Sequence, residues 1–477
     1  MQSKSDIPRV VIAALKGGAG KTFVSVGIVG ALRTRGMSPA VFKKGPDYID
    51  AGWLGLAADG DCYNLDTYLM TYEIVRGSFL KRSLEKDVSV VEGNRGLFDG
   101  FDVAGTYSTA QLAKLLKAPV ILIVDATKMT RTAAALVLGC RTLDPELRLK
   151  GVILNRVASD RHERILRQSI EEVSNIPVIG SVRKLSLDNF PQRHLGLLPL
   201  HEHPEAHAFV DEAANVAEQS IDLERVMEIA SNAGQFPSEL VPEVVDLGRP
   251  YEDSRVRIGI LRDSAFQFYY PENLEALQRR VGPLVEISAL DQAEFPDVDG
   301  LYIGGGFPET NAERLAENAF FKESLRKAIE HGLPVYAECG GLMYLSRNLW
   351  VDEKVYPMVG VFPIDSVMER QPQGLGYIRV QVERSNPFYP QGVVLTGHEF
   401  HYSSVRGLED AGDCCAFRVL QGHGMNGVRD GICRFNALGT YVHLHVLGEP
   451  LWAEGILRNA SAYRVNKAFQ VRRDSQE

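Results

Sequence analysis

Short apolar runs alternate with amphipathic stretches along the first half of the chain. Runs with the length and aliphatic content of buried strands lie at 9–15, 39–42, 88–92, 119–125 and 151–155. Helical patterns separate them, as at 108–117 and 160–175. This alternation predicts a parallel sheet that helices cover on both faces. Ligands of such sheets gather at the carboxyl ends of the strands, so polar residues that follow these runs are candidates for a site.

A second alternating series occupies the rest of the chain. It begins at 256–261 and continues through 300–306 and 334–337. Further segments look more like strands than helices, at 376–383, 392–405 and 415–420. Between the two series, residues 236–255 carry three prolines and scattered acids without periodicity, which is typical of a linker. We therefore expect two α/β domains, at 1–235 and 256–477.

The composition points away from nucleic acids and membranes. The 477 residues are 45% hydrophobic and 24% charged, with a net charge of −9 at pH 7, which opposes broad binding to polyanions. No apolar run reaches the about 18 residues of a transmembrane helix, and the N-terminus lacks the apolar core of a signal peptide. The six cysteines form no CxxC pair. We expect a cytoplasmic protein, and the sequence leaves a homodimer open.

A sharp turn in the second half carries the strongest chemical signal. The apolar run at 332–337 ends abruptly in Glu-Cys-Gly-Gly and then becomes helical. Cys339 stands on this turn, where the following amides favour a thiolate and a developing oxyanion. His443, in the later segment Tyr-Val-His-Leu-His, is a candidate base. Together they suggest thiol chemistry on an amide or ester. A cysteine that merely packs as a small hydrophobe is the alternative.

A second candidate site follows the first apolar run of the chain. The segment Lys16-Gly-Gly-Ala-Gly-Lys-Thr22 lies between that strand and a helical pattern. Its backbone can wrap phosphate oxygens at a helix N-terminus because it contains three glycines, Gly17, Gly18 and Gly20. Lys21 can reach the β- and γ-phosphates of a nucleotide, and Thr22 can ligate Mg²⁺. We expect a nucleotide site here, with a plain glycine-rich turn as the alternative.

Acids at the strand ends of the first domain suit a metal that accompanies the nucleotide. Mg²⁺ prefers one or two carboxylates together with phosphate oxygens and water. Asp47 and Glu92 fit that role, and the Thr22 hydroxyl would add a ligand. Asp99 and Asp125 are weaker candidates, because each could instead cap a helix or satisfy a loop.

Cations and an amide follow other strands of the same sheet. Lys43 and Lys44 could neutralise a substrate carboxylate or the γ-phosphate, although two adjacent lysines could equally be a solvated face. Asn155 ends a strand at the place where related nucleotide folds read the adenine edge. A role in the turn itself is the alternative for Asn155.

A series of motifs resembles the cobyrinate a,c-diamide synthase family along nearly the whole chain. Besides the phosphate loop and the Cys339 turn, the motifs are Lys43-Lys-Gly-Pro-Asp-Tyr-Ile-Asp50, Asn64-Leu-Asp66, Val91-Glu-Gly93 with Phe98-Asp-Gly100, His398-Glu-Phe-His-Tyr-Ser403 and Tyr441-Val-His-Leu-His445. The resemblance implies a P-loop NTPase-type doubly wound domain followed by a class I glutamine amidotransferase-like α/β domain. It also implies amidation of peripheral carboxylates on a modified tetrapyrrole, with ATP, Mg²⁺ and L-glutamine or ammonia.

The resemblance further implies roles for residues of the first domain. Nucleotide contacts would come from the loop at 16–22, including Lys16, and from Asn155. The side chains that would contact the substrate are Lys43, Lys44, Tyr48, Asp50 and Arg95. The resemblance supports Asp47 and Glu92 as metal ligands.

In the second domain the resemblance implies a glutaminase. Cys339 would form a γ-glutamyl thioester, with His443 as the base. The oxyanion hole would be built from amides that include those of Gly305 and Gly340. Ordinary class I glutaminases carry Glu two positions after the base, where this chain has His445. We therefore expect a weaker or differently completed triad.

One departure from the family pattern concerns the macrocycle. After Val91-Glu-Gly93 this chain has Asn94 and Arg95, where cobyrinate enzymes are expected to carry an apolar pair. These residues look more like relatives that amidate sirohydrochlorin, its nickel chelate or siroheme. Arg95 could pair bidentately with a substrate carboxylate, or with an acid of the protein. The reaction class is unaffected, and the macrocycle stays open.

Three remaining features give weaker signals. The histidine-rich segment 201–207 has the composition of a metal site, but Pro204 favours a polar loop. His398 and His401 could contact substrate or the other domain, or be structural, and the adjacent Cys414 and Cys415 suggest packing. The phosphate loop alone would also fit a ParA/MinD-like ATPase switch. Such switches are compact single domains, so the second half of the chain argues against that function.

Overall fold

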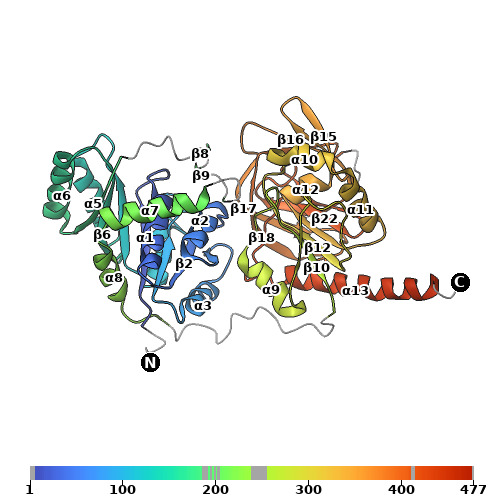
Figure 1. Ribbon diagram of the computed structural model, residues 1–477, viewed down its shortest axis with the longest axis horizontal. Coiled ribbons are helices and arrows are strands. Elements are labelled where there is room, and N and C mark those ends of the chain that lie inside the picture. Colours follow the sequence, from blue (N-terminus) through green and yellow to red (C-terminus); the bar gives the residue numbers. More distant parts are fainter. Residues whose placement is uncertain are drawn as a thin grey trace. The chain divides into compact units, whose positions relative to one another are not determined.

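The chain separates into two compact units, Met1–Val245 and Asp246–Glu477. The computed structural model describes residues 6–184, 205–237, 255–409 and 414–474, with short pieces at 192–193, 196–197 and 200. Most of the expected linker, 236–255, and most of the histidine-rich segment lie outside the described residues. Figure 1 shows that both units combine a sheet with flanking helices.

The first unit is built on a seven-stranded sheet. Its strand order is β3-β2-β4-β1-β5-β6-β7, and all paired strands are parallel. The strands are β1 (Arg9–Ala14), β2 (Pro39–Lys44), β3 (Cys62–Leu65), β4 (Val88–Glu92), β5 (Val120–Asp125), β6 (Leu149–Val157) and β7 (Val178–Arg183). A separate short pair joins β8 (Gln192–Arg193) to β9 (Gly196–Leu197). The predicted doubly wound parallel sheet is confirmed.

Helices cover this sheet and complete its core. They are α1 (Lys21–Thr34), α2 (Ile49–Ala58), α3 (Tyr72–Ser83), α4 (Thr109–Leu115), α5 (Thr132–Leu143), α6 (Asp160–Ser174), α7 (Ala206–Ser220) and α8 (Leu223–Ser231). Helices α1, α2 and α7 lie together in Figure 1, and α1 packs most extensively against α7. A Cβ on Gly27 of α1 would lie only 2.5 Å from the Ala213 carbonyl oxygen, so this approach requires glycine.

The second unit has a mixed nine-stranded sheet of order β11-β10-β12-β13-β22-β21-β20-β17-β18. The first five strands pair in parallel and the last five in antiparallel fashion, with β22 common to both parts. In sequence order they are β10 (Ile258–Leu261), β11 (Val285–Ile287), β12 (Gly300–Ile303), β13 (Val335–Glu338), β17 (Gly374–Val382), β18 (Val394–His401), β20 (Cys415–Gln421), β21 (Arg429–Arg434) and β22 (Ala437–Thr440).

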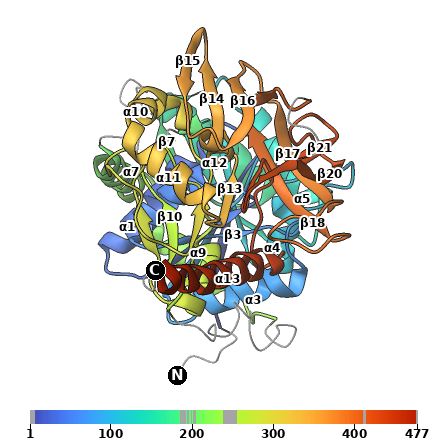
Figure 2. The ribbon, with the colours of Figure 1, turned by 90° about the vertical axis from the view of Figure 1, so that its right-hand side faces the viewer.

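A smaller sheet and several helices complete the second unit. The smaller sheet contains β14 (Ser346–Val351), β15 (Lys354–Pro357), β16 (Phe362–Met368) and β19 (Ser403–Arg406). The helices are α9 (Pro271–Val281), the 3-10 turn η4 (Pro308–Asn311), α10 (Ala312–Glu317), α11 (Ala319–Glu330), α12 (Gly340–Leu345) and α13 (Leu451–Asp474). Helix α13 packs against β12 and α9 (Figure 2). The class I amidotransferase-like α/β fold predicted for this half is confirmed.

A buried arginine fastens three segments of the first unit. Arg9 begins β1 and is fully shielded from solvent. Its guanidinium donates to the carbonyl oxygens of Leu116 at 2.7 Å, Ile7 at 2.9 Å and Gly234 at 3.0 Å. Burial, and then the charge of Arg148, lower the pKa of Arg9 to about 10. The side chain therefore replaces water for several carbonyl groups at once.

Arg9→Met should destabilise the first unit by at least about 3 kcal/mol, because each charge-assisted hydrogen bond contributes about 1.5–3 kcal/mol and the carbonyls would be left buried without donors. Urea unfolding combined with hydrogen exchange of β1 amides measures this unit separately. Arg35→Met is the matched control, since Arg35 pairs with Glu218 and Glu224 at the surface and should change stability by less than about 1 kcal/mol. Equal effects of the two substitutions would contradict the fastening role.

Candidate functional sites

The phosphate-loop segment connects β1 to the N-terminus of α1. Gly18 and Gly20 have positive φ angles of 69° and 88°, in the region that favours glycine. A Cβ on Gly20 would lie 2.2 Å from the Asn155 side-chain nitrogen, so a larger residue would displace Asn155. Lys21 Nζ donates to the Arg95 carbonyl oxygen at 2.8 Å. Burial, and then the charge of Lys43, lower the pKa of Lys21.

Two further predicted nucleotide residues flank this loop. Asn155, on β6, donates from Nδ2 to the Ala19 carbonyl oxygen at 2.9 Å and so supports the loop. This contact is the turn role left open by the sequence, and reading of adenine remains a prediction. Lys16 is 67% exposed, with Nζ 3.7 Å from Asp125 Oδ2. Asp125 also accepts from Arg156 at 2.8 Å and from Thr127, so protein donors already use this carboxylate.

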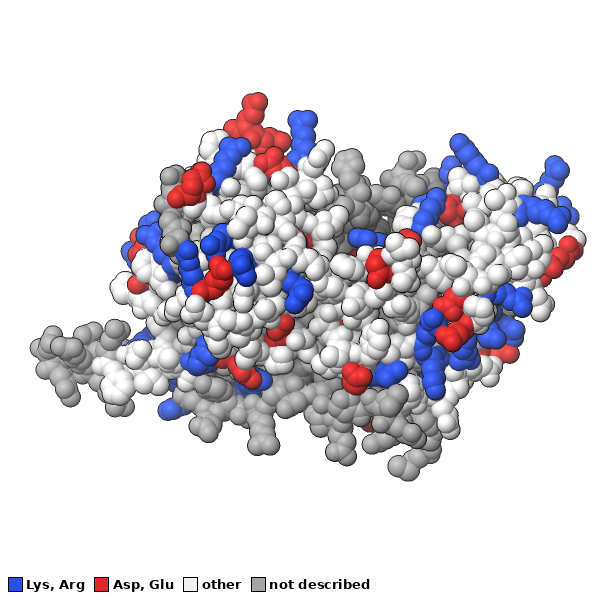
Figure 3. All heavy atoms as spheres, turned by 180° about the vertical axis from the view of Figure 1, so that it is seen from behind, with Lys and Arg blue, Asp and Glu red and all other residues white. Residues whose placement is uncertain are grey.

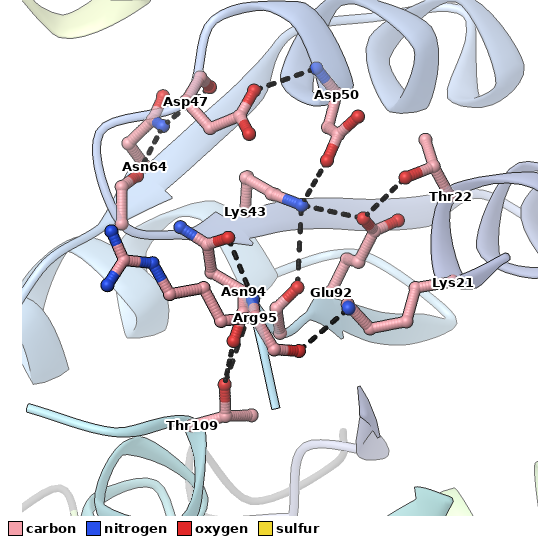
Figure 4. Close-up of polar contacts among 12 residues, drawn as sticks. Lys21, Thr22, Lys43, Asp47, Asp50, Asn64, Glu92, Asn94, Arg95 and Thr109 are labelled. Atoms are coloured by element: carbon pink, nitrogen blue, oxygen red, sulfur yellow. Dashed lines mark hydrogen bonds and ion pairs between the residues drawn. The ribbon is translucent and has the colours of Figure 1, made fainter. Parts of the chain in front are cut away.

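The lysine at the end of β2 joins the other elements of this site. Lys43 Nζ lies 2.5 Å from Asp50 Oδ2 and 2.6 Å from Glu92 Oε1 (Figure 4). The Thr22 hydroxyl donates to the same Glu92 oxygen at 3.0 Å. Burial opposes the charge on Lys43, but the carboxylates of Asp50 and Glu92 raise its pKa above the ordinary value. The side chain is therefore an ammonium whose charge is neutralised inside the protein.

The carboxylates around Lys43 differ in the direction of their pKa shifts. Burial would raise the pKa of Asp50, but the Lys43 ammonium holds it below its usual value. Burial and the neighbouring Asp50 charge raise the pKa of Asp47 to about 7. Asp47 Oδ1 accepts from the Asp50 amide at 2.9 Å, which brings both acids to the start of α2. Burial also raises the pKa of Glu92, against the effect of Lys43.

The predicted Mg²⁺ residues come together at this cluster, although the sequence did not predict that Lys43 lies among them. Within the described part of the chain, Glu92 Oε2 is buried and has no hydrogen-bond partner. Such an orphaned oxygen next to the Thr22 hydroxyl fits a cation. No group of three or more His, Cys, Asp or Glu side chains among the described residues could hold a metal on its own. Phosphate oxygens would therefore have to complete the coordination.

Of the predicted substrate residues, Lys43 and Asp50 lie within this cluster, and the others flank it. Tyr48 is the N-cap residue of α2, and Lys44 is buried at the end of β2. Burial lowers the pKa of Lys44. The negative charge of Asp66 raises this pKa again, and the positive charge of Arg95 lowers it further. Arg95 is exposed, has a φ of 50°, and carries its guanidinium away from Glu92 in Figure 4. No acid among the described residues forms an ion pair with Arg95.

In the second unit, Cys339 stands between β13 and α12. Its backbone has φ 46° and ψ −97°, a strained conformation for a residue other than glycine. Its amide donates to the Thr440 carbonyl oxygen at 2.8 Å, and Sγ lies 3.8 Å from the Phe400 carbonyl oxygen. Burial, and then the charge of Glu309, raise the pKa of Cys339, while the Gly340 amide opposes the shift. The resting thiol is therefore protonated and needs a base.

The side chain that orients His443 precedes the cysteine in sequence. Glu338 Oε2 lies 3.0 Å from His443 Nδ1, and the Tyr302 hydroxyl donates to the same oxygen at 3.1 Å. Both members of the pair are buried. A carboxylate on Nδ1 fixes the tautomer that leaves Nε2 to accept a proton. The sequence predicts a weaker or differently completed triad, and Glu338 supplies the carboxylate that residue 445 lacks.

The predicted oxyanion glycines lie beside this pair. A Cβ on Gly305 would come within 2.8 Å of His443 Cε1, and one on Gly340 within 3.0 Å of the Gly306 nitrogen. The loop after β12 and the turn at Cys339 therefore meet without room for side chains. Backbone amides at such a position can approach a bound carbonyl closely.

Two further histidines, His398 and His445, are buried near His443. The His398 ring stacks on His443 with centroids 4.9 Å apart, and its Nδ1 lies 3.1 Å from the Tyr270 hydroxyl. His445 Nε2 lies 3.4 Å from Glu272 Oε2, and both residues are buried. Burial, followed by His443 and His445, lowers the pKa of His398 well below its ordinary value, so this ring is neutral. His401 stacks on Tyr441, with ring centroids 3.6 Å apart.

Comparisons with known proteins agree with the division of chemistry between the units. Residues 10–197 match the CobQ/CobB/MinD/ParA nucleotide binding domain, and residues 257–451 match the CobB/CobQ-like glutamine amidotransferase domain. A nucleotide-binding domain joined to a glutamine amidotransferase domain defines a glutamine-hydrolysing carbon–nitrogen ligase. A compact ATPase switch does not account for the second match.

Full-length relatives narrow this class to one family. The protein named cobyrinate a,c-diamide synthase from Magnetococcus marinus is 42% identical, over 95% of this chain and 97% of the relative. Proteins with the same name from Archaeoglobus fulgidus and Methanothermobacter thermautotrophicus are 38% and 40% identical, over 95% of this chain and 98% and 99% of theirs. The chain belongs to the cobyrinate a,c-diamide synthase family.

Glu338→Gln should slow glutamine hydrolysis by about 10²–10⁴-fold, because an amide cannot stabilise the imidazolium that forms on His443 or hold its tautomer. The measurement is the initial rate of glutamate release. Glu272→Gln is the matched control, since it alters the other buried Glu–His pair and should change the rate less than about tenfold. A control variant as slow as Glu338→Gln would assign the orienting role to His445 and Glu272 instead.

Proposed function

We propose that this protein uses ATP and glutamine to convert the a and c side-chain carboxylates of cobyrinate into carboxamides. The observation that carries this proposal is the near full-length similarity to proteins named cobyrinate a,c-diamide synthase, at up to 42% identity among those compared. The geometry of both sites supports it, since one unit can activate a carboxylate and the other can release ammonia.

The second unit would release ammonia from glutamine. His443 accepts the Cys339 thiol proton as the sulfur attacks the amide carbon, and amides that include those of Gly305 and Gly340 stabilise the oxyanion. The C–N bond then breaks, ammonia leaves with the proton held by His443, and a γ-glutamyl thioester remains. Water hydrolyses the thioester to glutamate and restores the thiol. Glu338 keeps His443 oriented throughout.

The first unit would activate the carboxylate. A substrate oxygen attacks the γ-phosphorus of ATP, ADP leaves, and an acyl phosphate forms. Ammonia then attacks the acyl carbon, phosphate leaves, and a proton is lost. Lys21 and the amides of the loop at 16–20 would bind the phosphates, and Asn155 supports that loop. Thr22, Asp47 and Glu92 would hold Mg²⁺, which neutralises phosphate charge when bound.

The ion pairs of Lys43 affect how the substrate carboxylate can bind. Its ammonium is already paired with Asp50 and Glu92, so a substrate carboxylate must compete with these acids. Arg95 is exposed at the same end of the sheet and has no such short ion pair among the described residues, whereas Lys44 is buried. We therefore infer that Arg95 makes the first contact with a peripheral carboxylate, and that Lys43 serves the reacting one.

Surface and redox features support small-molecule substrates and a cytoplasmic setting. Basic and acidic side chains are interspersed on the face drawn in Figure 3, without an extended patch of one sign. None of the described helices is both long and apolar enough to cross a membrane. All six cysteines are free thiols. We propose that the enzyme works in a reducing cytoplasm without nucleic acid or membrane partners, and the homodimer stays a proposal.

Cys339→Ala should abolish glutamine-dependent amidation and preserve the ammonia-dependent reaction, because thiol and phosphate loop belong to different units. Mass spectrometry of the tetrapyrrole measures each amidation as a loss of about one dalton, the difference between OH and NH₂. Cys414→Ala is the matched thiol control and should keep both activities. Lys21→Ala is the reciprocal variant and should lose both. Loss of ammonia-dependent turnover in folded Cys339→Ala would contradict the division of labour.

A second candidate substrate is a sirohydrochlorin-type macrocycle, including the nickel chelate and siroheme. The observation that favours it is Arg95, an exposed cation without an acid partner among the described residues, where an apolar residue is expected for cobyrinate. Turnover of cobyrinate, sirohydrochlorin, nickel-sirohydrochlorin and siroheme under identical conditions decides between the two substrates.

Arg95→Met should raise KM for the macrocycle about tenfold and leave the ATP affinity unchanged, because it removes a bidentate partner of a substrate carboxylate. Steady-state kinetics measures the KM for the macrocycle when its concentration is varied, and the KM for ATP when the ATP concentration is varied. Arg156→Met is a control, since Arg156 pairs with Asp125 in the same unit. A change confined to ATP affinity or stability would show that Arg95 is structural.

A further inference from the structure

The loop between β4 and α4 exposes large apolar side chains. Phe101 is 54% exposed and Val103 is fully exposed, although both lie within a folded unit. Exposed apolar side chains that cluster at one loop tip mark a candidate contact surface for a ligand or partner. The loop therefore has a feature that packing of the first unit does not explain.

This loop is held in one conformation by its own hydrogen bonds. The Phe101 amide donates to the Thr106 carbonyl oxygen at 2.8 Å, and Asp102 accepts from the Thr106 amide at 3.0 Å and from its hydroxyl at 2.7 Å. At the base of the loop, the Leu97 amide donates to the Ala14 carbonyl oxygen of β1 at 2.7 Å. Hydrogen bonds therefore fix the backbone of the loop that carries the exposed side chains.

Three aromatic rings gather on this loop and on the neighbouring segment after β3. Tyr68 lies 5.3 Å from Tyr107 in an edge arrangement and 5.7 Å from Phe101, measured between ring centroids. The Phe101 and Tyr107 centroids are 6.3 Å apart. Tyr107 has a φ of 63°, which costs about 1 kcal/mol or more for a residue that is not glycine. Strain of this kind is typical of ligand sites.

The strands next to these rings also end in charged residues. Lys44, at the end of β2, lies opposite Leu65 of β3, and the next residue, Asp66, accepts from the Tyr68 amide at 2.7 Å. Arg95 is exposed and begins the loop that carries Phe101 and Tyr107, and its carbonyl oxygen accepts from Lys21 of the phosphate loop at 2.8 Å. The rings and the exposed Arg95 therefore share the carboxyl edge of the sheet, next to the phosphate loop.

We propose that Tyr68, Phe101 and Tyr107 bind the apolar face of the tetrapyrrole ring. This inference rests on the proposed function. A modified tetrapyrrole combines a broad apolar ring with carboxylate arms, and the surface offers matching groups: aromatic side chains and Val103 for the ring, and the exposed Arg95 for a carboxylate arm. Glutamine has no ring to place on such a surface, and the adenine ring of ATP is predicted to lie at Asn155. The rings would hold the macrocycle so that one carboxylate at a time reaches the γ-phosphate.

The test is an equilibrium binding titration of the full chain with cobyrinate and with sirohydrochlorin. The visible absorption of the tetrapyrrole reports how much of it is bound. Phe101→Ala should lower the affinity for the tetrapyrrole about 5- to 20-fold and leave the MgATP affinity and the rate of glutamine hydrolysis unchanged. Phe101→Tyr should retain wild-type affinity because it keeps the ring. Phe320→Ala is the matched control, since Phe320 is 80% exposed on α11 of the other unit.

Each other outcome overturns a defined statement. If wild-type protein amidates a tetrapyrrole but Phe101→Ala binds it equally well, the ring-binding role is wrong and the proposed function stands. If the wild type neither binds nor amidates any of the tetrapyrroles, both are wrong. If Phe101→Ala instead alters self-association in sedimentation equilibrium at unchanged affinity, the surface is a contact between copies of the chain, and the ring-binding role is again overturned.

Discussion

The buried ammonium of Lys43 is the interaction on which the first site depends. The parallel register of β2 and β4 sets Lys43 directly opposite Glu92, which has no exposed surface. Without this cation, Glu92 would be a buried carboxylate without a counter-charge, and removal of one partner from such a pair typically costs about 3–5 kcal/mol. The bond to Asp50 brings α2 into the same arrangement. One charge thereby aligns two strands and a helix around the phosphate loop.

The second unit solves a similar problem with neutral donors and a histidine. Glu338 ends β13, and its buried carboxylate is met by Tyr302 from the adjacent strand and by His443 after β22. These neighbours come from the parallel part of the sheet, so the carboxyl ends of parallel strands position the chemistry in both units. The two sites differ in charge. The first site buries an ammonium between carboxylates, and the second buries a neutral thiol that a base must deprotonate.

The sequence predicted the local features of both sites and missed the long-range ones. The strand-to-helix turns at residues 16–22 and at Cys339 follow from short segments whose glycines and apolar runs are readable in isolation. The orienting role of Glu338 depends on a residue 105 positions away, and its distance from His443 is set by strand pairing that no local pattern encodes. The same holds for Lys43 and Glu92, 49 positions apart. Strands β3 and β7 were not among the predicted runs, because β3 has four residues with a polar member and β7 is interrupted by glycine and serine, so neither has a long aliphatic run.

The backbone of Cys339 has a meaning beyond its chemistry. A cysteine with a positive φ of 46° occupies a conformation that glycine would adopt without strain. Selection for backbone conformation alone would therefore favour glycine at this turn. The thiol is kept against a standing conformational penalty of about 1 kcal/mol or more. In a lineage that took its nitrogen only from ammonia, replacement of Cys339 by glycine would relieve this strain and stabilise the fold. We therefore expect residue 339 to change before the rest of the unit once glutamine is no longer used.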